Sequence, residues 1–90
     1  MSLARTAKRR DANEREIIDA LTDMGAAVYQ LDTPCDLAVY FRDRWYMAEV
    51  KMPGKGLTPS QERDHARVSP GAIRILRSVE DAIAMLLGDE

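Results

Sequence analysis

The sequence predicts a single α/β domain in which helices flank a mixed β-sheet. Its 90 residues suffice for one small core but not for two domains. Hydrophobic residues make up 46% and charged residues 31%, which is typical of globular chains. Short β-prone runs alternate with helix-period segments in the order α-β-β-β-α-β-α, and this alternation favours an α/β sheet.

The first helix is expected over residues 11–24, followed by a strand over 27–31. Apolar residues in the helical segment recur at the spacing of one helix face. These residues are Ile17, Ile18, Leu21 and Met24. Gly25 is a typical residue just after a helix end, and Asp32-Thr33-Pro34 is typical of a turn after the strand.

Two further strands are expected over residues 36–41 and 45–52. The tight connection at 42–44 joins them into a β-hairpin. The run at 37–41 is apolar almost throughout, which is typical of strands covered on both faces. We therefore expect an open sheet with helices on each side.

A second helix is expected to begin near Thr58. Thr58 can cap it, Pro59 suits its first turn, and Gln61 stands where the partner of a capping box belongs. A break at 69–71 ends this segment. The helix should connect two parallel strands, which makes the sheet mixed.

The last two elements are a strand over residues 72–77 and a helix capped by Ser78. The strand is centred on Ile73, Ile75 and Leu76. The apolar face of the helix consists of Val79, Ala82, Ile83, Leu86 and Leu87. Both segments therefore have a face that can join the core.

Composition restricts the cellular setting. The single cysteine, Cys35, excludes an intrachain disulfide, and we expect it to be a half-buried loop residue. No apolar run approaches the roughly 20 residues that span a bilayer, and no signal peptide is recognisable. We expect a cytoplasmic protein without a membrane partner, and the small core makes a homodimer plausible.

Residues 1–10 are expected to form a basic arm ahead of the single domain at 11–90. The arm carries Arg5, Lys8, Arg9 and Arg10. It can lie along phosphates or remain a flexible, solvated terminus. The net charge of −2 counts against nucleic-acid binding, because affinity for phosphates usually comes with a basic surface.

Asp36, Glu49 and Lys51 are the residues that suggest chemistry. Residues two apart on a strand share a face, so Glu49 and Lys51 project together, and the hairpin brings Asp36 alongside Glu49. Adjacent carboxylates repel, and a divalent cation such as Mg²⁺ is the usual compensation. Two alternatives remain: Glu49 and Lys51 as a surface ion pair, and Asp36 as a plain turn residue.

These residues resemble the PD-(D/E)XK nuclease superfamily, and more narrowly the small VRR-NUC domains that stand alone in phages and bacteria. Archaeal Holliday-junction resolvases are similar at greater distance. The matching segments are 13–18 with Gly25, 34–37, 49–51 and 57–61. The resemblance spans residues 11 to about 87 and implies a restriction-endonuclease-like αβββαβ(α) core.

The resemblance also implies roles for individual residues. Asp36 and Glu49 would bind Mg²⁺ or Mn²⁺ together with the backbone carbonyl of Val50, and Lys51 would be the catalytic lysine. Glu14 would be a helix-borne acid at the edge of the site, assisting metal binding; its alternative is a solvated acid in the first helical turn.

Gln61 would match the glutamine of the family that faces the site, although the capping box explains it equally well. His65 lies one turn further along and can point to the same cleft or to solvent. Cys35 departs from the family, which often has glycine or proline before the aspartate, and its side chain could alter the approach of the loop to DNA.

Contacts to DNA are expected from Arg9, Arg10, Arg15 and Lys55. An ion pair with Asp19 on the same helix face is the alternative for Arg15. Trp45 and Tyr46 can stack at a DNA junction, or belong to the core or to a dimer interface.

The predicted function is a Mg²⁺- or Mn²⁺-dependent DNA endonuclease, acting as a homodimer on branched, flap or Holliday-junction DNA. The first alternative is a catalytically silent module with a nuclease fold that binds nucleic acid or protein. A structural dimerisation protein is the second. It would show neither stabilisation by metal nor salt-dependent DNA binding.

Overall fold

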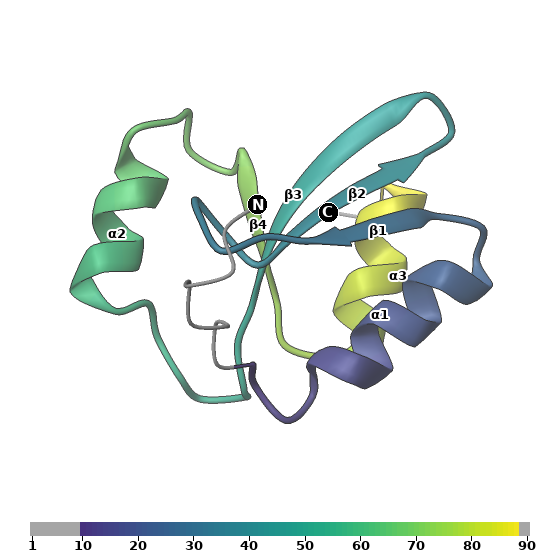
Figure 1. The fold of residues 1–90 in the computed structure, drawn as a ribbon, viewed down its shortest axis with the longest axis horizontal. Helices are drawn as coiled ribbons and strands as arrows, with labels where there is room; N and C mark the ends of the chain where they lie inside the picture. The colour runs from purple at the N-terminus through teal and green to yellow at the C-terminus, as the bar shows by residue number, and fades with distance from the viewer. Residues whose placement is uncertain (1–9, 89–90) are drawn as a thin grey trace, which may run out of the picture.

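The computed structural model describes residues 10–88 and contains four strands and three helices. Their order confirms the predicted α-β-β-β-α-β-α arrangement. In chain order they are α1 (Glu14–Asp23), β1 (Ala27–Gln30), β2 (Leu37–Phe41), β3 (Arg44–Val50), α2 (Pro59–Ala66), β4 (Ile73–Leu76) and α3 (Val79–Leu87). The protein is therefore an α/β domain (Figure 1).

The sheet is mixed and follows the order β1-β2-β3-β4. β1 pairs antiparallel with β2, and β2 antiparallel with β3, whereas β4 runs parallel to β3 as predicted for strands joined through α2. Phe41 and Arg44 are the last pair of the hairpin. Between them Arg42 and Asp43 both have positive φ, 51° and 66°, which suits the twist of a two-residue hairpin turn.

α1 and α3 lie side by side against one face of the sheet (Figure 1). The inward side chains alternate along β2 and β3, so every second residue joins the core. α1 contributes its predicted apolar stripe, with Ile17 and Leu21 fully buried. The stripe predicted for α3 is correct only in part: Ala82 and Leu86 are buried, but Leu87 is 52% exposed and Met85 is buried in its place. The strand residues of this core are Leu37, Val39, Phe41, Tyr46, Ala48, Val50 and Leu76.

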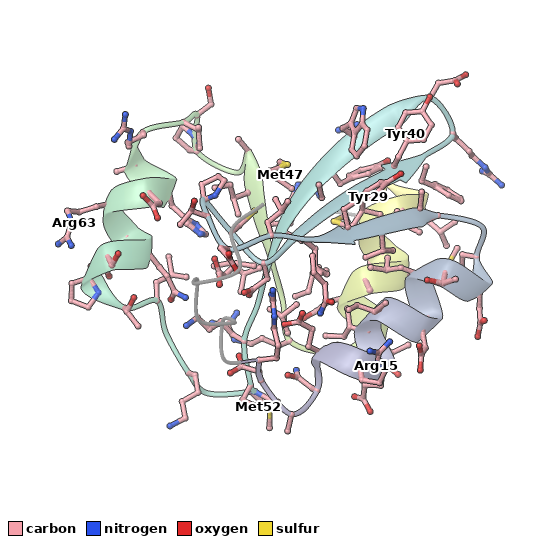
Figure 2. The ribbon with its side chains drawn as sticks, viewed as in Figure 1. Arg15, Tyr29, Tyr40, Met47, Met52 and Arg63 are labelled. Carbon is pink, nitrogen blue, oxygen red and sulfur yellow. The ribbon has the colours of Figure 1, made fainter. Side chains whose placement is uncertain are left out.

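The opposite face of the sheet is open where three aromatic rings gather. Tyr40 and Trp45 are cross-strand partners with ring centroids 5.0 Å apart, and the Tyr29 ring lies 6.0 Å from that of Trp45. Tyr29 and Tyr40 stand on the side of the sheet away from α1 and α3 (Figure 2). Since Trp45 is 57% exposed, the expectation of strands covered on both faces is wrong. We call these three residues the aromatic face.

α2 stands apart from the other two helices, beyond the end of the sheet (Figure 1). It buries none of its residues fully, in contrast to α1 and α3. The predicted capping box is present: Gln61 N–H donates to Thr58 Oγ1 and Thr58 N–H donates to Gln61 Oε1. Ser78 caps α3 as predicted, accepting from the N–H of Asp81.

None of the helices within residues 10–88 has the length and apolar character needed to span a membrane.

Candidate active site

Asp36 and Glu49 lie opposite one another where β2 begins and β3 ends. Leu37 pairs with Ala48, and one further step in this register aligns Asp36 with Glu49. Two hydrogen bonds continue the pairing: Asp36 N–H donates to the Ala48 carbonyl (3.1 Å), and Val50 N–H donates to Asp36 Oδ2 (2.8 Å). The register therefore places Asp36 opposite Glu49, as predicted.

All four residues of the predicted acid and lysine set are buried. Glu49 is 1% exposed, Glu14 2%, Asp36 5% and Lys51 9%. Two alternatives are therefore wrong: the surface ion pair and the solvated first-turn acid. Asp36 does lie in a bend before β2, but its buried carboxylate also accepts from Val50 N–H. Charged groups are costly to bury unless compensated, so this placement requires a compensating arrangement.

Glu49 is held by two side chains from α2. Gln61 Nε2 donates to Oε2 at 3.1 Å, and His65 Nε2 lies 3.4 Å from Oε1. Gln61 thus performs both of its predicted roles, since its Oε1 closes the capping box while its Nε2 contacts Glu49. His65 faces the site, which the sequence left open.

Lys51 follows Val50 directly after the end of β3. Ala48 and Val50 point into the core, whereas Glu49 contacts α2 from the opposite face of the sheet. Lys51 N–H donates to the Leu76 carbonyl (3.0 Å), so the extended pairing with β4 continues to this residue. Strand alternation then places Lys51 on the face of Glu49, as predicted.

Glu14 and Asp36 share a cation, Arg10. Its Nη1 lies 3.3 Å from Glu14 Oε2 and 3.6 Å from Asp36 Oδ1. Arg10 Nη2 also donates to the Leu31 carbonyl (3.2 Å), and Gln30 Nε2 donates to Glu14 Oε2 (2.9 Å). Arg10 was expected on a flexible arm, but its side chain lies within the candidate site.

Asn13 connects three elements around the site. Its Nδ2 donates to the carbonyls of Lys51 (3.1 Å) and Arg77 (3.0 Å), which follow β3 and β4. Asn13 is the N-cap residue of α1 but makes no side-chain cap bond. Sequence reasoning missed this role, because an asparagine before a helix normally indicates a cap and nothing local indicates partners 38 and 64 residues away.

Two further predicted DNA contacts, Arg15 and Lys55, lie at the surface. Arg15 is 3.8 Å from Asp19 on the exposed side of α1, so the alternative ion pair is present (Figure 2). Lys55 is exposed in the loop after β3, and Arg77 Nη2 donates to its carbonyl (2.9 Å). Arg9 and the rest of the basic arm lie outside the described residues.

The two aromatic candidates, Trp45 and Tyr46, lie on different faces of the sheet. Tyr46 belongs to the core, whereas Trp45 is on the aromatic face.

Cys35 is 1% exposed rather than half-buried, and its thiol contacts the Leu37 carbonyl at 3.6 Å. Burial raises the pKa of this thiol to about 11. The Cys35 side chain is therefore not a surface feature that DNA would meet.

The buried side chains at the ends of β2 and β3 offer oxygen donors. Within residues 10–88, no three His, Cys, Asp or Glu side chains form a metal cluster. Mg²⁺ is commonly held by one or two carboxylates, with water and substrate phosphate filling the other positions. Asp36, Glu49 and the Val50 carbonyl are oxygen donors of that kind.

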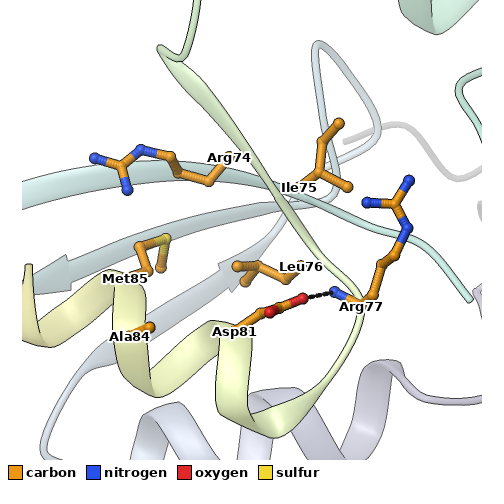
Figure 3. Close-up of a pocket in the computed structure, with 7 residues that line it drawn as sticks. All are labelled: Arg74, Ile75, Leu76, Arg77, Asp81, Ala84 and Met85. Atoms are coloured by element: carbon orange, nitrogen blue, oxygen red, sulfur yellow. Dashed lines mark hydrogen bonds between the residues drawn. The ribbon is translucent and has the colours of Figure 1, made fainter. Parts of the chain in front are cut away.

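Two hollows lie near these elements. One of about 130 Å³ is lined by residues of the candidate site, Arg10, Glu14 and Gln30, together with Arg15. A larger one of about 340 Å³ lies between β4 and α3 and contains none of the predicted site residues (Figure 3). We take the smaller hollow as the surface of the candidate site, because it lies beside buried Glu14 whereas the larger one contains none of the predicted residues.

Comparison of the chain with protein-family models, curated proteins and solved structures found no match. The geometry of the site and the sequence pattern therefore carry the functional argument.

Proposed function

We propose that the protein is a Mg²⁺- or Mn²⁺-dependent endonuclease that hydrolyses phosphodiester bonds in DNA. The proposal rests on one observation: Asp36 and Glu49 are both buried at opposing positions of neighbouring strands, and buried Lys51 follows Glu49 by two residues. Adjacent buried carboxylates repel and are costly, so a function that needs them is a better explanation than stability. The restriction-endonuclease-like core is part of this proposal.

The chain would hold the ion through Asp36, Glu49 and the Val50 carbonyl, with Glu14 at the edge. Such an ion supplies a polarised phosphate and a more acidic water. The protein contributes rigidity: the Val50 N–H orients Asp36, while Gln61 and His65 orient Glu49 from α2. Contacts of this kind keep ligands in a productive geometry.

Lys51 is the proposed catalytic lysine. Its ammonium would offset negative charge that develops on the phosphate, or position the attacking water. The strand backbone fixes its distance from Glu49, because residues two apart on one strand keep a constant separation. The burial of Lys51, which is 9% exposed, also restricts its side chain more than that of a surface lysine.

Branched DNA and a second subunit are part of the proposal. A two-fold homodimer would present two sites to a symmetric junction. The aromatic face is an exposed apolar surface that a second subunit could cover. Lys55, Arg15, Arg10 and Arg9 would contact phosphates, so DNA binding should weaken as salt increases.

The decisive experiment is a cleavage assay on labelled four-way-junction, flap, linear and single-stranded DNA. Each substrate is incubated with Mg²⁺, Mn²⁺ or EDTA. Wild-type protein should cut only with metal, Glu49→Ala should not cut, and Glu62→Ala, at an exposed acid of α2, should cut normally. Equal cutting by Glu49→Ala would refute the assigned site, and no cutting by folded wild type would favour a silent binding module.

A further inference from the structure

Arg10 is the residue of the candidate site whose position is least expected. Its guanidinium approaches Glu14 at 3.3 Å, Asp36 at 3.6 Å and Asp32 at 3.9 Å, and it donates to the Leu31 carbonyl. A single cation therefore joins α1 to the loop between β1 and β2. It also lies beside two of the acids proposed to serve the metal.

These contacts are loose compared with the other bonds in the site. Charge-assisted N–H···O⁻ bonds are typically about 2.7–2.9 Å long. The Val50 N–H meets Asp36 Oδ2 at 2.8 Å, whereas Arg10 approaches Oδ1 at 3.6 Å. The contact of Arg10 with Asp36 is therefore longer than the backbone bond that fixes the other oxygen of this carboxylate.

The location of Arg10 also favours release of its side chain from Glu14 and Asp36. It precedes α1 and lies outside the regular secondary structure, and its side chain is 26% exposed. A long arginine side chain can turn to solvent from such a position without movement of the backbone. Asp36 and Glu49, in contrast, are anchored by the strands and by α2.

We propose that Arg10 is a displaceable counter-cation of the site. In the metal-free protein it neutralises Glu14 and Asp36. It competes with a divalent ion for Asp36, and on release it becomes available to a DNA phosphate. This inference rests on the proposed function. It adds that a side chain of the protein itself, Arg10, competes with the metal ion for one of its ligands.

Competition between Arg10 and a divalent ion predicts the sign of two changes, in stability and in metal affinity. Both changes can be measured without DNA. Loss of the Arg10 charge should destabilise the metal-free protein, because Glu14 and Asp36 lose a neutralising partner. The same loss should strengthen divalent binding, because the ion no longer has to displace a cation. An arginine that only supports the site structure would give the opposite effect on metal affinity.

The test is calorimetric titration of Mn²⁺ into wild type, Arg10→Gln and the matched control Arg15→Gln. We expect Arg10→Gln to bind Mn²⁺ roughly two- to fivefold more tightly, a change of the size that one partly exposed charge can produce. Thermal melting should show Arg10→Gln less stable than wild type in EDTA and gaining more from saturating Mn²⁺. Arg15→Gln should match wild type in both measurements.

Other outcomes separate this inference from the proposed function. Equal or weaker Mn²⁺ binding by folded Arg10→Gln, with wild-type cleavage intact, would overturn the role of Arg10 alone. Absence of Mn²⁺ binding in wild type and in Arg10→Gln would overturn both, because no competition exists for an ion that does not bind. Binding only by Arg10→Gln would be the strongest support.

Discussion

The side-chain amide of Gln61 donates a hydrogen bond of 3.1 Å to Oε2 of Glu49. The same side chain accepts from Thr58 N–H to close the capping box of α2. One residue therefore sets both where α2 begins and how Glu49 is oriented. α2 buries none of its residues fully, so this polar contact matters for the position of the helix.

The two roles of Gln61 can be separated by substitution. Thr58→Ala removes the cap acceptor only, and should cost about 1 kcal/mol of unfolding free energy while leaving cleavage near wild type. Gln61→Ala also removes the donor to buried Glu49, and should cost a further ~1–3 kcal/mol. Denaturant unfolding and DNA cleavage of both variants provide the measurement. Equal loss of cleavage in the two would show that the contact with Glu49 is unimportant.

Substitution of Lys51 should separate catalysis from metal binding. Lys51→Ala should keep the fold and bind Mn²⁺ but lose cleavage by roughly 10²–10³-fold, the size expected for one electrostatic contact in a transition state. Lys51→Met, which retains the apolar stem, distinguishes loss of charge from loss of packing. Calorimetry and cleavage rates are measured on the same preparations.

Asp36→Asn should instead lose both metal binding and cleavage. The asparagine retains an oxygen for the Val50 N–H, so the start of β2 should be preserved while the charge is removed. Circular dichroism checks the fold, and Mn²⁺ titration checks the ligand. Full cleavage by Asp36→Asn would contradict the assignment of this carboxylate.

Most elements could be predicted because their signals are local. The stripe on α1, the capping box at Thr58 and Gln61, and the cap at Ser78 each depend on residues within a few positions. The hairpin was predicted, but its connection at 42–44 was one residue too long: Arg44 pairs with Phe41, and this register aligns Asp36 with Glu49. The acid and lysine set followed from that register.

The contacts that complete the site depend on distant parts of the chain. Asn13 donates to the carbonyls of Lys51 and Arg77, and Arg10 approaches Asp36 26 residues later, so no local spacing predicts either contact. Hydrophobicity also failed to distinguish the two faces of β2. Tyr40 and Val39 are both apolar enough to suggest burial, but only Val39 faces the core.

The hairpin turn offers a stabilising substitution. Arg42 and Asp43 both have positive φ, which glycine tolerates better than other residues. Asp43→Gly should raise the unfolding free energy by about 0.5–1 kcal/mol, and the melting temperature by about 4–8 °C for each kcal/mol. Asp43→Ala is the control, because it loses the 3.2 Å hydrogen bond from Tyr40 Oη but keeps the strain. A glycine variant no more stable than the alanine variant would contradict the assigned strain.

Cys35 predicts a pH dependence above neutrality. Burial raises the pKa of its thiol from 9.0 to about 11, so in this interval the unfolded chain releases a proton that the folded protein keeps. The contribution of the buried thiol to the free energy of unfolding is complete below pH 9 and is lost as pH rises towards 11. The stability of the protein should therefore fall across that range. At pH 8 the folded thiol should react with iodoacetamide on the order of 100-fold more slowly than in denaturant, because thiolate is the reactive form. Cys35 is the single cysteine, so the labelling signal is unambiguous, and equal rates in the two states would show that the thiol is accessible and ordinary.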